Sequence, residues 1–323
     1  MGQIKHAPRE LETRKIIIDT DPGRDDAAAI LLALASPELE VVGIVAVAGN
    51  VPLHHTERNA RRIVDLAGRS DVPVYAGCER PMARELVTSE HIHGQTGLAG
   101  YELPEPIKQL ESLHGVEFII ETVMSSESGT ITLCHIGPLT NISTALVKEP
   151  RIAGRIREIV LMGGSRAEAG NITPSAEYNI YVDPEAADIL LNSGIAITIA
   201  PLDVCGLVLG SREMLARFGN LGNRAGAAIA GLLDFSQSLD LTRWRGIGAP
   251  LWDPCAVAYL IQPELFTGKM VNVCVETMSP LTRGMTVVDW WHATDRPPNV
   301  NFLYDVNVEG FFNLLTERFA RLP

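Results

Sequence analysis

Short runs of β-branched and aliphatic residues alternate along the chain with longer stretches of helical pattern. The runs cover residues 15–19, 41–47, 130–135, 158–162 and 195–199. Most consecutive positions in these runs are apolar, whereas a strand with one face in water would carry a polar residue at every second position. We therefore predict an α/β fold with a mostly parallel central sheet flanked by helices, an open Rossmann-like core.

The stretch between the first two runs has the length and composition of a buried helix. Residues 25–36 begin with two Asp and continue almost entirely with Ala, Ile and Leu, and the Ser36–Pro37 dipeptide ends the pattern. Proline disfavours helical backbone in the residue before it, so the helix should stop there. Because apolar residues surround its axis, we expect this helix to be buried on most sides.

The rest of the chain shows no internal repeat, low-complexity tract or shift in composition. Residues 1–323 are therefore predicted to form a single domain, with residues 1–14 as a flexible N-terminal extension. The first fifteen residues lack the apolar segment of a secretory signal, and no apolar run approaches the ~20 residues that span a bilayer. Five widely spaced Cys without a C-x-x-C pair favour buried thiols in a reducing compartment. We expect a cytoplasmic protein with no membrane partner.

The charge of the chain is strongly acidic. Its formal net charge is −12, from 27 Lys and Arg against 39 Asp and Glu. A surface that binds nucleic acid needs a basic stripe, which this balance argues against. We expect no nucleic-acid partner, and part of the negative charge is available to balance a bound cation.

Four carboxylates fall within eight residues where the first strand passes into the predicted helix: Asp19, Asp21, Asp25 and Asp26. A strand's two-residue period places Asp19 and Asp21 on one face, and the helix dipole favours negative charge at the helix start. Capping explains one such residue, but four in an apolar neighbourhood would repel one another unless a cation balanced them. Oxygen ligands without nearby His or Cys indicate calcium or magnesium, and calcium tolerates the more irregular geometry.

Polar residues also follow the other predicted strands. They are Asn50, residues 137–141, the residues from Gly163 onward, and Leu202–Asp203. Ligands of open parallel sheets bind at the carboxyl ends of the strands. We therefore expect these residues to converge on one edge of the sheet.

Taken alone, the D-x-D-x-G-x-D-D pattern is only moderately specific. An EF-hand loop also spaces acids around a glycine, but here no Glu closes such a loop and Pro22 precedes Gly23. A haloacid-dehalogenase-type phosphatase also begins with D-x-D after its first strand. That family needs in addition a downstream Lys and a further Asp pair, which the sequence does not show clearly. On the motif alone the phosphatase hypothesis stays open.

Further motifs occur in order along nearly the whole chain. They are DTDPGRDDAAAILLAL from Asp19, VAVAGNV at 45–51, HGQTGL at 93–98, IGPLTNIS at 136–143, IVLMGG at 159–164, GNITPSAEYNIYVDPEAA at 170–187, DPCAVAYL at 253–260 and TRGMTVVD at 282–289. Together they resemble the nucleoside hydrolase family, which includes inosine-uridine-preferring and purine-preferring nucleosidases. The resemblance implies calcium-dependent hydrolysis of the N-glycosidic bond of ribonucleosides to ribose and free base.

Carried over position by position, the resemblance implies a Ca²⁺ site. Its ligands would be the carboxylates of Asp21, Asp26 and Asp253 and the main-chain carbonyl of Ile136. The family often has Thr at position 136, but Ile should serve because only a main-chain oxygen is used. Asp21 would also act as the general base that takes a proton from the attacking water.

The resemblance also implies a set of residues that contact the sugar: Asp25, Asn50, Met162, Asn171, Glu177, Tyr178 and Asn179. Asp25 and Asn50 would hold the ribose hydroxyls, and Asn171, Glu177 and Asn179 would grip the far side of the sugar and its 5′-hydroxyl. Glu177 and the surrounding carboxylates would stabilise the oxocarbenium-like transition state. A site that pairs the 2′-hydroxyl rejects the deoxy analogue, because its own polar groups would be left unpaired.

The chain departs from the family beside the last metal ligand. Many members carry His before the Asp of the DPCAVAY segment, where it is thought to protonate the leaving base, but this chain has Trp252. Trp here resembles the purine-preferring subgroup, and the larger purine ring gains more from stacking on an indole. His93 is the other candidate for the acid. A packing role for Trp252 and a loop-anchoring role for His93 are the alternatives.

Three more features fall on the base side of the predicted site. Residues 91–106, with three Gly and two Pro, predict a long irregular loop that is typical of lids, and a second mobile stretch is expected around 239–250. His91, Arg243, Trp244 and Arg245 lie in or near these stretches and are candidate contacts for the base. Tyr178 adds a hydroxyl near the ribose where the family often has Phe. Arg24 replaces the usual aliphatic residue, and the sequence offers no physical account of it.

Other functions compete with purine nucleoside hydrolysis. They are a nucleoside-binding protein with little turnover, because the acid is replaced, and a pyrimidine-preferring ribonucleoside hydrolase. Retention of Asp21 and of every predicted metal ligand favours catalysis. A phosphohydrolase ranks third, because no basic phosphate cradle lies near the acids. The expected partners are a small-molecule ribonucleoside and, from the family, further copies of the chain in a homodimer or homotetramer.

Overall fold

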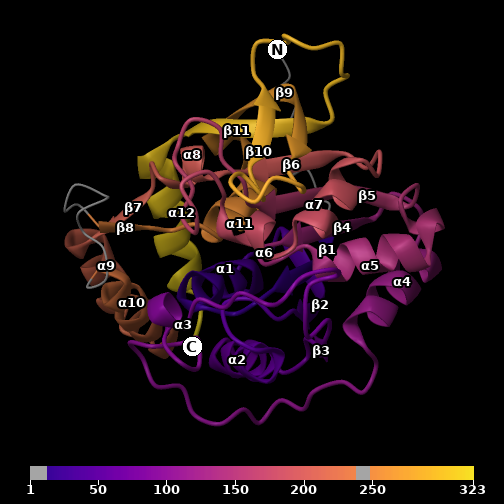
Figure 1. The fold of residues 1–323 in the computed structure, drawn as a ribbon. Helices are drawn as coiled ribbons and strands as arrows, with labels where there is room; N and C mark the ends of the chain where they lie inside the picture. The colour runs from indigo at the N-terminus through magenta and orange to yellow at the C-terminus, as the bar shows by residue number, and fades with distance from the viewer. Residues whose placement is uncertain (1–12, 238–247) are drawn as a thin grey trace, which may run out of the picture.

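The computed structural model describes residues 13–237 and 248–323 around a nine-stranded sheet (Figure 1). The strands are β1 (Arg14–Thr20), β2 (Leu39–Ala46), β3 (Val74–Ala76), β4 (Ile131–His135), β5 (Ile156–Met162), β6 (Ile197–Ala200), β9 (Phe266–Val275), β10 (Thr286–Asp289) and β11 (Val300–Val306). Their order in the sheet is β10-β9-β11-β6-β5-β4-β1-β2-β3. All neighbours pair in parallel except β9, which is antiparallel to both β10 and β11. The predicted α/β fold with a mostly parallel sheet is confirmed.

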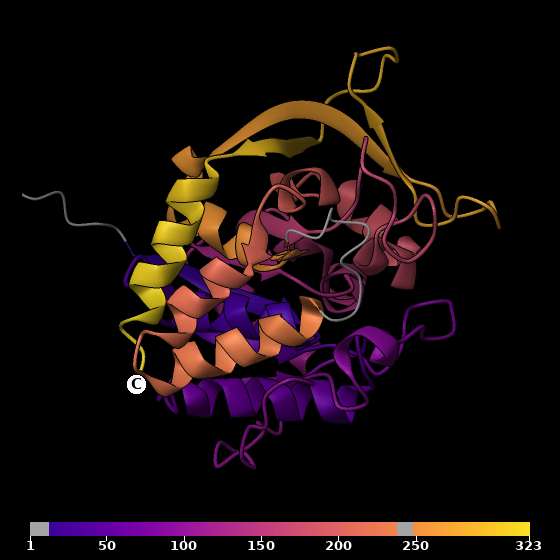
Figure 2. The same ribbon diagram turned by 90° about the vertical axis from the view of Figure 1, so that its left-hand side faces the viewer.

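Helices cover both faces of the sheet because its strands are apolar on both sides. Ile16 and Ile18 pack into one layer with α1 (Arg24–Leu34), α2 (Leu53–Leu66), α9 (Arg212–Gly219), α10 (Arg224–Gln237), α11 (Pro254–Ile261) and α12 (Val308–Phe319). Ile17 faces the other layer, formed by α4 (Gly115–Ser125), α5 (Thr140–Lys148) and α7 (Pro184–Leu191). Figure 2 shows the C-terminal helix α12, in yellow, packed beside α9.

Helix α1 behaves as its composition predicts. It begins at Arg24 and ends at Leu34, and every residue in it except Asp25 is buried. The backbone N–H of Gly23 donates to the Asp26 carboxylate at 2.9 Å, which satisfies one of the free donors at the helix start. The chain therefore enters its most buried helix directly from the acidic motif.

The structure corrects two predictions at the edges of the domain. Arg14 is not part of an extension: it opens β1 and forms an ion pair with Glu158 at 2.7 Å, while residues 1–12 lie outside the described part. All five cysteines are free, but only Cys134, Cys205 and Cys255 are buried. Cys78 and Cys274 are partly exposed: Cys78 follows β3, and Cys274 is the second-last residue of β9.

The two predicted loops are partly ordered into short elements. Residues 90–93 form α3 (Glu90–His93), and only the chain from Gly94 onward is irregular. In the second stretch, β8 (Gly248–Pro250) pairs with β7 (Leu209–Ser211), and residues 239–247 lie outside the described part. The remaining short elements are α6 (Tyr178–Val182), α8 (Leu202–Cys205) and the 3₁₀ turns Pro150–Ile152 and Pro263–Leu265. Within the described residues, no helix has the length and apolar character needed to cross a bilayer.

Candidate active site

The strand order reverses direction between β1 and β4, since the chain runs from β1 outward to β2 and β3 and then returns to β4. Such a switch point leaves a crevice outside the carboxyl ends of the two strands, because the connections leave in opposite directions. One cavity lies at this edge of the sheet. Its walls include Asn50 after β2, Ile136 after β4 and Met162 at the end of β5. Of the polar residues that were predicted to converge on one edge, Asn50 lines this cavity.

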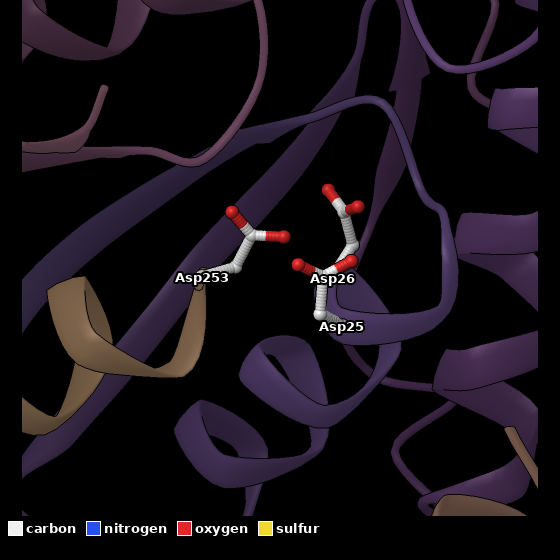
Figure 3. Close-up of side chains that lie close together, drawn as sticks. All are labelled: Asp25, Asp26 and Asp253. Atoms are coloured by element: carbon white, nitrogen blue, oxygen red, sulfur yellow. The ribbon is translucent and has the colours of Figure 1, made fainter. Parts of the chain in front are cut away.

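Three carboxylates, those of Asp25, Asp26 and Asp253, cluster beside the cavity, and Asp25 and Asp253 line it. Asp25 and Asp26 stand in the first turn of α1, and Asp253 immediately precedes α11 (Figure 3). One oxygen from each of the three lies within 4.8 Å of the other two. Burial, and then the charges of neighbouring Asp, raise the pKa of Asp26 to about 7 and that of Asp253 well above its usual value.

Asp21 lies beside this cluster and is held on one side only. Its Oδ2 accepts the backbone N–H of Asn50 at 2.7 Å, whereas its Oδ1 is buried without a hydrogen-bond partner among the described residues. Burial, and next the charge of Asp26, raise the pKa of Asp21 well above its usual value. The Oδ2 atom of Asp21 is thus fixed by a hydrogen bond, and its Oδ1 atom is available to a cation or a substrate.

Two glycines of the sequence motifs make room for Asp21. A Cβ on Gly49 would lie 2.1 Å from Asp21 Oδ2, and a Cβ on Gly137 would lie 2.7 Å from Oδ1. Both distances are far below van der Waals contact, so any other residue would displace the carboxylate. The AGN and IGP segments therefore carry Gly because two backbones approach the same side chain.

Asp26 is held by three donors. They are the hydroxyl of Thr20 at 2.6 Å, the N–H of Gly23 at 2.9 Å and the side-chain amide of Asn50 at 3.2 Å. Buried oxygens that repel one another, together with the unpartnered Oδ1 of Asp21, suit a hard divalent cation. The donor set therefore fits the metal that the sequence predicts.

The sequence and the geometry group the acids differently. The predicted ligands are Asp21, Asp26 and Asp253, whereas the tightest oxygen cluster contains Asp25 in place of Asp21. Asp21 is nevertheless close enough for its charge to raise the pKa of Asp253. Ile136, whose carbonyl is the fourth predicted ligand, lines the same cavity. These ligand assignments remain predictions.

The far wall of the cavity comes from the GNITPSAEYN segment. Glu177 is buried ahead of α6 and accepts the backbone N–H groups of Gly164, Asn179 and Ile180 at 3.0, 2.9 and 3.2 Å. Burial raises the pKa of Glu177 to about 7, although these donors oppose the shift. The side-chain amide of Asn179 donates to the Met162 carbonyl at 3.1 Å. These side chains are fixed before any ligand arrives.

Asn171 and Tyr178 complete this wall. Asn171 Oδ1 accepts the backbone N–H of Tyr178 at 2.8 Å, and both residues line the cavity. The Tyr178 hydroxyl donates to the Val87 carbonyl at 2.8 Å. The hydroxyl that was expected near the ribose is therefore engaged with the segment that precedes α3.

Trp252 and His93 both line the cavity, as does His91. Trp252 also packs against the core cluster behind it, so its lining and packing roles coexist. His93 Nδ1 accepts the backbone N–H of Arg24 at 3.3 Å. Burial, followed by the positive charge of Arg24, lowers the pKa of His93 to about 3, so its ring is neutral near pH 7. This favours the anchoring interpretation of His93 over the acid.

Arg24 is buried and lines the cavity. Burial lowers the pKa of its guanidinium to about 10, and the charge of Asp25 opposes the shift. Arg24 therefore stays charged and contributes positive potential beside His93. The other candidate base contacts, Arg243, Trp244 and Arg245, lie outside the described residues.

Two residues that sequence reasoning missed connect the cavity to its surrounding segments. Ser89 Oγ donates to Asn50 Oδ1 at 2.8 Å. Asn59 Nδ2 donates to the carbonyls of Pro22 and Thr96 at 3.1 and 2.7 Å, which ties the HGQTGL loop to the first motif. Asn59 is buried in α2, and a polar residue on that helix's apolar face was the available signal. No comparable pattern in the sequence marks Ser89.

Fold and site together define a class: an α/β enzyme with a buried acidic metal-binding cluster in the crevice of an open sheet. Residues 16–313 match the family model described as inosine-uridine preferring nucleoside hydrolase. The chain belongs to that nucleoside hydrolase family, as the motifs predict. It is therefore an enzyme of the nucleoside hydrolase class.

Similar proteins cover nearly the whole chain. An uncharacterized protein of Schizosaccharomyces pombe is 49% identical over 309 residues, covering 96% of this chain and 100% of its own length. A pyrimidine-specific ribonucleoside hydrolase of Photobacterium profundum is 46% identical over 309 residues, covering 95% and 99%. Among solved structures, a purine-preferring ribonucleoside hydrolase from Gardnerella vaginalis has 36% identity and a TM-score of 0.88, covering 95% of this chain and 98% of that one.

Proposed function

We propose that this nucleoside hydrolase releases ribose and free base from ribonucleosides in a calcium-dependent reaction and favours purine nucleosides. The observation that carries the proposal is the pairing of a buried acidic cluster with the unpartnered Oδ1 of Asp21. In a binding protein that oxygen would serve only the cation, whereas hydrolysis also needs a base next to the water that attacks.

Asp26, Asp253 and Asp21, together with the Ile136 carbonyl, would hold the cation. A cluster of carboxylate oxygens suits a hard cation. Calcium accepts more ligands and less regular geometry than magnesium, which demands near-ideal octahedral geometry. When bound, the cation lowers the pKa of a coordinated water and binds neighbouring sugar hydroxyls. Asp25 and Asn50 would hold those hydroxyls from the protein side.

Asp21 takes the proton from the attacking water at its free Oδ1. Its Oδ2 stays on the backbone of Asn50, which keeps the free oxygen in one direction. Burial raises the pKa of Asp21, and a more basic carboxylate is the better proton acceptor. The water oxygen then forms the new bond to the anomeric carbon.

As the C–N bond breaks, its electron pair leaves with the base and positive charge develops on the sugar. Glu177, anchored by three backbone donors, lies on the wall that faces the sugar and stabilises that charge. Asn171 and Asn179 hold the 5′-hydroxyl side, and Met162 packs beneath the ring. The departing base takes up a proton from solvent, and Asp21 releases to solvent the proton that it took from water, so that ribose and neutral base are the products.

Trp252 supports the purine preference, because its indole lines the cavity next to the cluster. A second candidate is a pyrimidine-preferring hydrolase, since the Photobacterium profundum relative with that specificity shares 46% identity with this chain. The purine-preferring relative of known structure shares 36%. Overall sequence identity therefore favours a pyrimidine-preferring hydrolase, whereas Trp252 favours a purine-preferring one.

The test is release of reducing sugar from inosine, adenosine, guanosine, uridine and cytidine, after chelation and again with calcium or magnesium restored. We expect purine nucleosides to react, calcium to restore more activity than magnesium, and Asp21→Ala to be inactive. Faster turnover of uridine and cytidine would establish the pyrimidine candidate. Tight binding of inosine without any release would establish a nucleoside-binding protein instead.

The family resemblance also supports a homodimer or homotetramer. Light scattering of the purified chain measures this directly, and a mass near 35 kDa would overturn the proposal. The free cysteines support the further prediction that the protein works in the cytoplasm. A fluorescent fusion located outside the cytoplasm would overturn it.

A further inference from the structure

Asn50 connects Ser89, which precedes α3, with two buried carboxylates beside the cavity, Asp21 and Asp26. Its backbone N–H donates to Asp21 Oδ2 at 2.7 Å. Its side-chain amide donates to the Asp21 carbonyl at 3.1 Å and to Asp26 Oδ2 at 3.2 Å. The orientation of this one side chain therefore affects both acids.

An Asn amide has two orientations that differ by exchange of its oxygen and nitrogen. In the observed one, Nδ2 faces two acceptors, and Oδ1 faces the Ser89 hydroxyl, which donates to it at 2.8 Å. In the reversed one, Oδ1 would face the two acceptors and repel them. Asn50 and Ser89 are both more than nine-tenths buried at the cavity wall, and Ser89 is the protein donor that Asn50 Oδ1 has there.

The hydroxyl of Ser89 can be removed without breaking the backbone bond between Ser89 and Asn50. Its backbone N–H donates to the Asn50 carbonyl at 2.9 Å, independently of its side chain. The same segment is also anchored by the bond from the Tyr178 hydroxyl to Val87. Removing the hydroxyl of Ser89 therefore leaves the segment before α3 anchored. It takes away the donor to Asn50 Oδ1, a longer 3.5 Å contact with the Asn50 carbonyl and the contact with the Tyr178 hydroxyl.

We propose that Ser89 is a positioning residue for the hydrolysis: its hydroxyl holds the Asn50 amide in the orientation that fixes Asp21 and Asp26 for reaction. The inference deepens the proposed function and rests on the role of Asp21 as the base. Without the hydroxyl, Asn50 Oδ1 is buried and unpaired, and the amide samples orientations that leave Asp21 misaligned. Because Asn50 shares the proposed ribose contacts with Asp25 and the cation, the loss appears more in the chemical step than in nucleoside binding.

The test compares Ser89→Ala with Thr88→Ala on inosine or on the best nucleoside of the panel. Thr88 is the matched control, because its hydroxyl lies in the same segment but bonds to Glu90 instead of Asn50. We expect kcat to fall about ten-fold in Ser89→Ala with KM changed less than two-fold, the effect of one buried donor lost. Thr88→Ala keeps the wild-type kcat, and both variants keep the wild-type melting temperature within a few degrees.

A double-mutant cycle identifies the route of the effect. If Ser89 acts through Asn50, then adding Ser89→Ala to Asn50→Ala changes kcat less than two-fold. Ser89 also interacts with the Tyr178 hydroxyl, and adding Ser89→Ala to Tyr178→Phe should still lower kcat about ten-fold. An unchanged kcat in Ser89→Ala, or effects that multiply fully with Asn50→Ala, would overturn the inference. A wild-type chain that releases no ribose would instead overturn the proposed function.

Discussion

The parts of the cavity that we propose hold the sugar (the sugar end) and the nucleobase (the base end) are built differently. At the sugar end, Asp26 and Glu177 each accept three hydrogen bonds, and their donors come from strand ends and helix starts. The base end is lined by rings: Trp252, His91 and His93. Atoms fixed by several partners suit chemistry that all substrates share, whereas ring faces suit discrimination among bases. The difference separates catalysis from specificity within one cavity.

Removal of Asp21, the proposed general base, should have the largest effect on kcat. The size of the effect should not depend on which nucleoside is used. Asp21→Asn keeps an oxygen for the Asn50 N–H but cannot take a proton, so kcat should fall about 10³-fold for purine and pyrimidine nucleosides alike. The chelated variant should melt at a higher temperature than the chelated wild type, because one of several repelling buried carboxylates is gone. Steady-state kinetics and calorimetry measure both.

Asp203→Asn is the matched control for that variant. Asp203 also follows a strand at the same edge, but its carboxylate accepts the backbone N–H groups of Arg166 and Ala167 and does not line the cavity. It should keep wild-type kcat. A loss for Asp21→Asn that differs strongly between purines and pyrimidines would contradict the separation of the two ends.

Removal of the cation should affect stability in a pH-dependent way. Asp26 has a pKa of about 7 in the folded, metal-free chain and about 3.9 when unfolded, so the folded state binds the proton more tightly. The stability this proton contributes is complete below about pH 4 and is lost as the pH rises toward 7 and above. At the proposed site calcium would replace this proton, so the gain in melting temperature on adding calcium should increase from pH 5 to pH 8. At saturating calcium we expect about 5 °C at pH 8.

The measurement is a thermal melt with chelator and with calcium across this pH range. Asp253→Asn should weaken the gain, because it removes a carboxylate from the cluster. A calcium effect that is equal at pH 5 and pH 8 would show that the cation does not compete with protons at these carboxylates.

The sugar end was predictable because its residues belong to motifs that follow strands. Asn50 and Met162 lie where the strand pattern and the switch point place them, and Glu177 was placed by its motif. The strands were predictable because their apolar runs are continuous. Residue-level details were not: the engagement of the Tyr178 hydroxyl with Val87 is a long-range contact that no local pattern encodes.

The base end was harder to predict, because loop positions depend on tertiary contacts. The short helix α3 within the predicted loop starts at Glu90, and Ser89 before it bonds to Asn50 from another strand end. The neutral state of His93 depends on its burial and on the charge of Arg24, which no spacing in the sequence reports. Local sequence patterns thus predicted the elements but not the contacts between them.

Replacement of the indole at the base end should change specificity more than catalysis. Trp252→Ala should lower kcat/KM for inosine about ten- to a hundred-fold, the range expected for loss of one stacked base. Uridine should lose less, because its ring offers a smaller face to the indole. The ratio of the two kcat/KM values, measured with and without the substitution, decides the point. An equal loss for both would assign Trp252 to packing against the core instead.

The smallest effect on kcat is expected for substitution of His93. The result decides whether this ring anchors its loop or donates a proton to the leaving base. His93→Asn places an amide oxygen near the position of Nδ1, so the bond from the Arg24 N–H is retained and kcat should stay within about three-fold of wild type. Because burial and Arg24 lower the pKa of His93 to about 3, its ring does not titrate between pH 5 and pH 9. The pH profile of kcat/KM should therefore keep its shape in the variant. Disappearance of an alkaline limb that the wild type shows would instead identify His93 as the proton donor to the leaving base.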